Sequence, residues 1–193
     1  VADDVLVELF NVHFLDGSFS QADMLEQRLM DIYEVILARW NFSTQLPLGP
    51  LLHLVKRQKY SKVVELCERV LQSLVNSSKS ILLSKATVCA VLSQAFHAQE
   101  KVEQAHEYCN QAINAYREWR NILDEDSQGN GDNSEVILVI AIACFDLKYY
   151  QQAEFFAREV LCCLRKLAPR IWFAAIPLGI LARIYLESGE YEK

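Results

Sequence analysis

The sequence predicts an all-α fold in which antiparallel helix pairs stack into an α-solenoid. Apolar residues recur at helical spacing along the chain, and no segment alternates with period two for long enough to form a strand. Turn signals separate the apolar segments and recur with a period near 42 residues. A period between about 20 and 50 residues indicates stacked supersecondary units rather than a single globular core.

Each expected helix is bounded by a turn signal or by a polar segment. In chain order the helices are 3–15 and 20–40, separated by Gly17-Ser18; 48–57 and 60–77, separated by Gln58-Lys59; 80–98 and 102–123, separated by Glu100-Lys101; 134–147 and 150–167, separated by Lys148-Tyr149; and 170–188, followed by Gly189-Glu190. These nine segments form four pairs and a final helix that begins a fifth pair.

The residues after the turns follow a second pattern. A bulky residue comes directly after each turn, at Phe19, Tyr60, Val102, Tyr150 and Tyr191. A small or compact residue follows three positions later, at Ala22, Val63, Ala105 and Ala153. Two antiparallel helices approach closely only where a side chain is small, and a bulky neighbour then fills the gap to the next helix. The pattern therefore predicts regular helix stacking.

Composition excludes several other classes of protein. The chain has 193 residues, of which 52% are hydrophobic, with only six glycines and four prolines, so it is neither disordered nor collagen-like. Its longest uncharged apolar stretch, residues 136–145, is about half as long as a bilayer span requires. The six cysteines form no C-x-x-C motif, and we expect reduced, buried thiols in an intracellular protein of the cytoplasm or nucleus. Two N-x-S/T sequons, at Asn41 and Asn76, would matter only outside the cell.

Three stretches resemble the tetratricopeptide repeat. They are Leu181-Ala182 with Tyr185, Gly189 and Tyr191; Leu92 with Phe96, Ala105 and Ala112; and Ile140-Ala141 with Tyr150 and Ala153. The long period is similar to that of kinesin light chains, and HEAT-like arrays are the alternative. The resemblance implies a right-handed superhelix with units at 3–43, 44–85, 86–133, 134–174 and a truncated 175–193. Because the chain stops within a unit, we expect it to belong to a larger protein.

In tetratricopeptide arrays the first helix of each unit lines a concave groove that holds a peptide. The resemblance places the groove positions at Val7, Asn11, Leu48, Leu52, Ala90, Gln94, His97, Leu138, Ile142, Gly179 and Arg183. This set is mostly apolar and lacks the lysine of carboxylate-clamp members, so it is better suited to an amphipathic helix than to a peptide carboxylate. We therefore expect a non-catalytic scaffold that binds a protein partner or an adjacent part of its parent protein. The alternative is a regulatory or oligomerisation arm of a larger enzyme.

Charge is distributed unevenly along the chain, whose net charge is −6. Residues 35–85 carry eight Lys and Arg against two acidic residues, whereas both flanks are acidic. The candidate basic patch consists of Lys56, Arg57, Lys59, Lys62 and Arg69. It suits an acidic partner, phosphate or RNA, and its alternative is a solvated helix end. The acidic flanks make binding to nucleic acid the less favoured of these functions.

One loop has the spacing of a calcium site. Its oxygen ligands would come from Asp124, Asp126, Gln128, Asn130, Asp132 and Glu135, as in an EF-hand loop. The alternative is an acidic connection between repeats, with Asp132, Asn133 or Ser134 capping the next helix. His106 and Cys109 form the only other pair at ligand spacing, and no second pair completes it. We therefore expect no bound cofactor, and the sequence carries none of the nucleotide-binding or hydrolase motifs.

Overall fold

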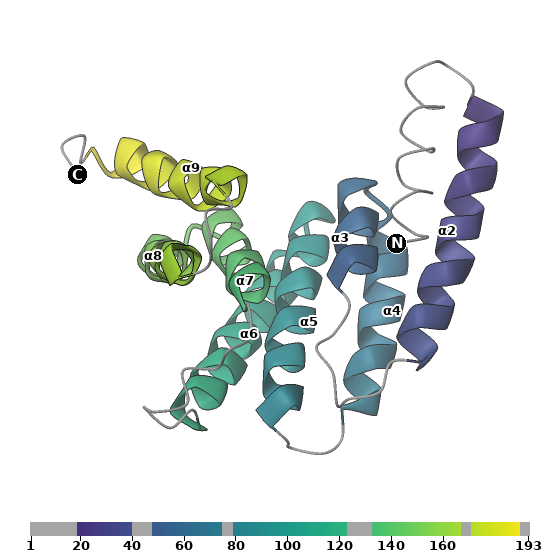
Figure 1. The fold of residues 1–193 in the computed structure, drawn as a ribbon, viewed down its shortest axis with the longest axis horizontal. Helices are drawn as coiled ribbons and strands as arrows, with labels where there is room; N and C mark the ends of the chain where they lie inside the picture. The colour runs from purple at the N-terminus through teal and green to yellow at the C-terminus, as the bar shows by residue number, and fades with distance from the viewer. Residues whose placement is uncertain (1–18, 40–47, 75–78, 123–132, 167–170, 190–193) are drawn as a thin grey trace. The chain divides into compact units, whose positions relative to one another are not determined.

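A computed structural model describes residues 19–39, 48–74, 79–122, 133–166 and 171–189. Every regular element in these ranges is an α-helix, which confirms the predicted all-α fold (Figure 1). In chain order the helices are α2 (Phe19–Arg39), α3 (Leu48–Lys56), α4 (Tyr60–Ser73), α5 (Lys79–Ala98), α6 (Val102–Ile122), α7 (Ser134–Asp146), α8 (Tyr150–Lys166) and α9 (Ile171–Ser188).

The predicted helix boundaries agree closely with these. Each predicted end lies within four residues of the observed end, and the largest difference is at α4, which ends at Ser73 rather than at residue 77. The predicted helix 3–15 and the turn at Gly17-Ser18 lie outside the described residues.

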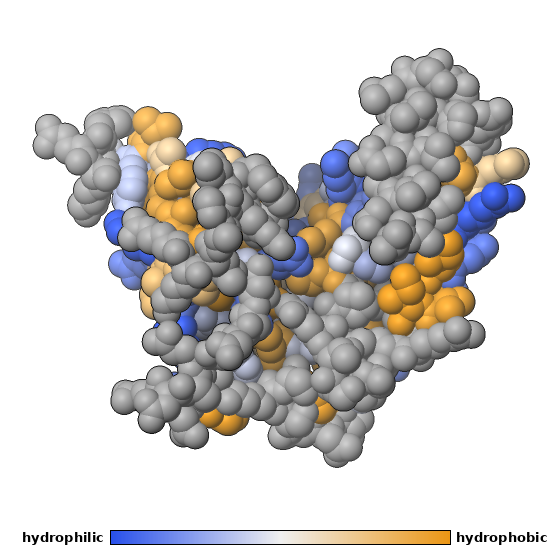
Figure 2. Space-filling model, viewed as in Figure 1, coloured by the Kyte–Doolittle hydropathy of each residue, from blue (hydrophilic) through white to orange (hydrophobic). Residues whose placement is uncertain are grey.

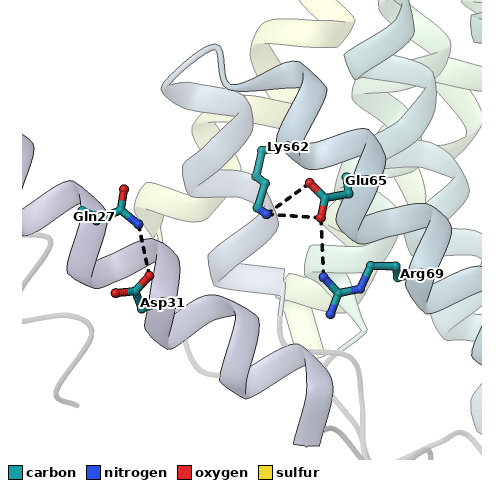
Figure 3. A network of polar contacts seen from close by, with 5 residues as sticks. All are labelled: Gln27, Asp31, Lys62, Glu65 and Arg69. Atoms are coloured by element: carbon teal, nitrogen blue, oxygen red, sulfur yellow. Dashed lines mark hydrogen bonds and ion pairs between the residues drawn. The ribbon is translucent and has the colours of Figure 1, made fainter.

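The chain divides into two compact units, residues 1–50 and 51–193. In the first unit, α2 buries Leu29 and Tyr33, whereas Met24 on the same helix is 61% exposed. The side-chain amide of Gln27 donates a hydrogen bond of 3.1 Å to the Asp31 carboxylate one turn later (Figure 3).

In the second unit, each helix from α4 to α9 packs on the next helix along the chain (Figure 1). Two contacts join helices that are not consecutive in the chain. Helix α5 packs on α7, and α7 packs on α9. We call α5, α7 and α9 the first helices of their pairs, and α6 and α8 the second helices. The first helices α5 and α7 therefore have more neighbours than the second helices do, whereas α9 contacts two helices, as α6 and α8 do.

Burial follows this difference in the number of neighbours. The first helices α5 and α7 are buried on most sides, including Ala90 and Leu92 on α5 and Ile140 on α7, all with no exposed surface. Helices α4, α6 and α8 each bury one face, with buried residues three or four positions apart, and leave the other face to solvent. Helices that are apolar on every side are thus the ones that have neighbouring helices on several sides.

Helix α5 also contains a segment, Ile81–Ala98, that is long and apolar enough to cross a bilayer. Of this segment, 78% is buried inside the protein. Core helices of folded domains have the same length and composition, so the segment is weak evidence for a membrane span.

The same backbone turn closes α3, α5 and α7. The second residue after each helix has a left-handed backbone, with φ of 58° at Gln58, 62° at Glu100 and 61° at Lys148. At Glu100, the backbone N–H donates to His97 O at 2.9 Å, and the next N–H, of Lys101, donates to Phe96 O at 2.9 Å. The equivalent pairs of bonds occur after α3 and α7. These are Schellman turns, formed here without glycine, and they occupy three of the predicted turn positions.

Replacing Glu100 with glycine should stabilise the protein by up to about 1 kcal/mol, since a side chain is disfavoured at positive φ. The exposed Glu118, inside α6, offers a matched control. Glu118→Gly should lower the free energy of unfolding by about 1 kcal/mol, because glycine is unfavourable within a helix. Urea denaturation followed by circular dichroism measures both changes. If the two variants lost the same stability, the left-handed assignment at residue 100 would be contradicted.

Candidate functional site

The first helices present a continuous set of polar and apolar side chains to solvent. We call this surface the first-helix face and define it by Gln94, His97, Ile142, Phe145, Asp146 and Arg183, all half-buried or exposed. The members on one helix are three or four residues apart and so share a side of it. Contacts between the helices, described next, bring the three sets together.

Gln94 connects α5 to α7. Its Nε2 donates a hydrogen bond of 3.1 Å to the backbone oxygen of Val139, which lies inside α7. A half-buried amide held in this way has a fixed orientation, and its Oε1 remains to accept a hydrogen bond from a partner.

Arg183 connects α9 to α7. Its guanidinium lies over the ring of Phe145, 4.6 Å from the ring centroid. This cation–π contact contributes about 0.5–1 kcal/mol at an exposed site. Gly179 lies one turn earlier on α9, and a Cβ atom built there would meet nothing within 4 Å beyond its chain neighbours and the backbone of its own helix. The α9 part of the face is therefore open beside a positioned arginine.

Asp146 is the half-buried acid of the first-helix face. Burial raises the pKa of its carboxyl group above the ordinary value of 3.8, while His97 on α5 and Arg183 on α9 lower it. Because the folded protein holds the proton more tightly than the unfolded chain does, the ionised carboxylate destabilises the fold. The stabilising contribution of the protonated Asp146 carboxyl group is fully present at acidic pH, and it is lost as the pH rises through the raised pKa. Asp146 therefore costs stability at neutral pH.

Replacing Asp146 with asparagine should stabilise the protein at pH 7 and change its stability little at acidic pH. The amide has nearly the shape of the protonated acid and is not ionised at either pH, so the pH-dependent loss disappears. Urea denaturation of the wild type and of Asp146→Asn, at pH 7 and at a pH below 3.8, measures the change in the free energy of unfolding at each pH. Glu118→Gln removes an exposed carboxylate and should change stability by less than about 0.5 kcal/mol at pH 7. A destabilised Asp146→Asn protein at pH 7 would contradict the expected sign.

The structure places the predicted groove residues in different environments. Three are buried in the folded chain, so they have little surface for a partner: Leu48, Ala90 and Leu138. Leu52 on α3 is half-buried, and Val7 and Asn11 lie outside the described residues. The remaining members, Gln94, His97, Ile142, Gly179 and Arg183, are half-buried or exposed on the first helices.

Two members of the face were missed by the sequence analysis. Phe145 and Asp146 follow Ile142 by three and four residues, which is the spacing of a shared helical side. That spacing could have identified them as members of the same helical side.

The predicted basic patch is partly neutralised by an acid on its own helix. Glu65 of α4 accepts a hydrogen bond from Lys62 at 3.1 Å and lies 3.6 Å from the guanidinium of Arg69 (Figure 3). Lys56 and Lys59 are exposed near the turn after α3. Two of the five cations therefore already interact with a carboxylate, which reduces the positive field available to phosphate.

Most of the predicted calcium loop, residues 124–132, lies outside the described residues. Of its six candidate ligands only Glu135 is described, exposed in the first turn of α7. Asn133 occupies the N-cap position of α7 without a side-chain capping bond. Among the described residues, no group of three or more His, Cys, Asp or Glu side chains is arranged to hold a metal ion.

His106 and Cys109 of α6 contact different partners. His106 Nδ1 lies 2.7 Å from the Tyr149 hydroxyl, and the sulfur of Cys109 lies 3.8 Å from that of Cys144. The hydrogen bond with Cys109 and burial both raise the pKa of the Cys144 thiol. Burial also raises the pKa of Cys89, to about 12. Such thiols are protonated at neutral pH and poorly nucleophilic.

All six cysteines are described, and none of them forms a disulfide. Four of them are buried, Cys162 is exposed and Cys163 is half-buried. The buried set therefore consists of small core residues, as the sequence predicts.

Comparisons of the chain with protein-family models, with curated proteins and with solved structures gave no match.

Proposed function

We propose that this chain forms a tetratricopeptide-like α-solenoid and acts as a non-catalytic scaffold for protein–protein interaction. Its partner is a peptide or amphipathic helix, which binds on the first-helix face. The buried free thiols support an intracellular, cytoplasmic location.

The packing order of the helices supports the solenoid. In such arrays each pair contacts only its neighbours, and successive first helices line one side. The packing of α5 on α7 and of α7 on α9 agrees with this arrangement. The left-handed turn residues, at Gln58, Glu100, Lys148 and Gly189, recur at intervals of 42, 48 and 41 residues.

The observation that carries the binding proposal is the position of Asp146. The Asp146 carboxylate costs stability at neutral pH because of its burial, and the charges of His97 on α5 and Arg183 on α9 favour its ionised form. Stability is commonly given up at sites that function requires. Ile142 and Phe145 add apolar surface on the same side of α7. The face therefore suits an amphipathic helix with an apolar stripe and a lysine or arginine placed to reach Asp146.

Affinity capture with the whole chain, followed by mass spectrometry, tests the proposal. Proteins captured by the wild type should be reduced about tenfold or more with Ile142→Glu and with Arg183→Glu, since one hot-spot contact is worth more than about 1 kcal/mol. Neither residue is fully buried, so both variants should remain helical by circular dichroism.

Glu118→Lys provides the control for a surface charge change. Glu118 is exposed on α6, outside the first-helix face, and this variant should capture the same proteins as the wild type. If folded Ile142→Glu and Arg183→Glu proteins captured the same proteins as the wild type, the first-helix face would not be the binding site.

The surface of α9 favours a second candidate function, an oligomerisation arm. Ile176, Leu178 and Leu186 are 49%, 52% and 59% exposed, and Figure 2 shows apolar surface at the position that α9 has in Figure 1. A second copy of the chain could cover this surface. Sedimentation equilibrium should then show a dimer for the wild type and a monomer for Leu178→Glu. A monomeric wild type at all concentrations would exclude this candidate.

A further inference from the structure

A cleft between the two second helices shares no residue with the first-helix face. It has a volume of about 380 Å³ and is open to solvent, with lining residues from α6 and α8. Both helices pack on α7, and they meet each other through the rings of Tyr116 and Phe156 and the ion pair of Arg120 with Glu159. Next to these contacts the two helices are separated by the cleft.

The apolar part of the cleft is aromatic. The rings of Tyr116 and Phe156 meet edge to face at 5.3 Å, and those of Phe155 and Phe156 at 5.2 Å. Tyr116 and Phe156 are buried, whereas Phe155 is 56% exposed. A ligand side chain that covered the Phe155 ring would remove a large apolar surface from water, which is the main source of affinity in such sites.

The polar part of the cleft carries positive charge. Arg120 pairs with Glu159 and donates to the Tyr116 hydroxyl at 3.4 Å, so its guanidinium has a fixed position. Arg117 makes no hydrogen bond or ion pair with any residue that the structure describes. With Glu159 neutralising one arginine, the cleft keeps one positive charge in a chain of net charge −6. A guanidinium in this setting matches a carboxylate in a bidentate geometry.

Three side-chain amides complete the lining, from Asn121, Gln151 and Gln152. Each amide offers both donors and an acceptor, which is what the backbone of a bound peptide requires. The volume lies at the lower end of the range of ligand sites, about 300–1,000 Å³, and accommodates one large side chain with its neighbouring backbone.

We propose that the α6–α8 cleft binds a short acidic peptide segment in which a large apolar side chain lies next to an aspartate or glutamate. The apolar side chain covers Phe155, and the carboxylate pairs with Arg117. One arginine, Arg117, supplies too few phosphate contacts for nucleic acid, and the net charge of the chain opposes such binding. This site is independent of the first-helix face, and the chain would therefore hold two different partner segments.

Selection of peptides from a random phage-displayed library on the whole wild-type chain tests the inference, with counter-selection on Arg117→Glu. The enriched peptides should share a large apolar residue flanked by aspartate or glutamate. A labelled peptide of this set, measured by fluorescence anisotropy, should bind Arg117→Glu and Phe155→Ala about tenfold or more weakly than the wild type. Its binding should also weaken as salt is added.

Two matched variants serve as controls. Arg28→Glu reverses an exposed arginine on α2, and Met24→Ala removes an exposed apolar side chain on the same helix. Both should bind the peptide like the wild type. The inference is overturned if no peptide is enriched, if the enriched peptides are basic, or if folded Arg117→Glu protein binds them with unchanged affinity. None of these variants alters the first-helix face. A failure of the cleft proposal can therefore be distinguished from a failure of the proposed function.

Discussion

Replacing Phe156 with alanine is expected to lower the free energy of unfolding by about 3–5 kcal/mol. Phe156 is only 2% exposed, and its ring meets Tyr116 of α6 edge to face at an interplanar angle of 80°. Removing the ring deletes this contact and leaves a cavity between α6 and α8, which neighbouring helices fill only in part. Urea denaturation followed by circular dichroism measures the change.

The adjacent residue provides the control for this prediction. Phe155 is 56% exposed, so Phe155→Ala should lower the free energy of unfolding by less than about 1 kcal/mol. Typical domains have only about 5–15 kcal/mol of stability, and Phe156→Leu offers a milder variant if the alanine protein does not fold. Equal losses at residues 155 and 156 would show that the ring of Phe156 is not in the core.

Replacing Ala105 with leucine is expected to lower the free energy of unfolding by about 1–3 kcal/mol through overpacking. Ala105 has no exposed surface, and its backbone oxygen accepts a 2.9 Å hydrogen bond from the buried hydroxyl of Ser93 on α5. This bond requires α5 and α6 to approach closely at the alanine, and a leucine side chain would force them apart.

The same substitution at an exposed alanine isolates the packing effect. Ala182 on α9 is exposed, so Ala182→Leu should change stability by less than about 0.5 kcal/mol. Ala153 lies five residues after its left-handed turn residue, as Ala105 does, and also has no exposed surface. Ala153→Leu should therefore destabilise the protein as Ala105→Leu does, and a neutral result at both sites would contradict the close-approach explanation.

Helix positions could be predicted from the sequence because they depend on local signals. The turn at Glu100-Lys101 separates two apolar-periodic segments, and the backbone reverses there. The buried small residues at Ala105 and Ala153 were predicted in the same way, because their distance from the turn is constant. Local spacing therefore specified most of the described helices.

The surfaces were predicted less well because they depend on which helices meet. Ala90 and Leu138 are buried because α5 and α7 have neighbours on several sides, a property that a single helix pattern does not contain. The α6–α8 cleft likewise depends on how two helices diverge beyond the Tyr116–Phe156 contact. The pairing of Glu65 with Lys62 and Arg69 could have been predicted from the sequence, since these residues are three and four positions apart on one helix.

The Schellman turns have a practical consequence. Their hydrogen bonds join backbone atoms only, and the side chains of Glu100 and Lys148 are exposed. Once the exposed Cys162 is replaced, a cysteine introduced at either position can carry a fluorophore or a surface attachment without removing a contact that holds the helices together. A pair of labels at these two sites would report the spacing between successive helix pairs, and any change in that spacing when a partner binds.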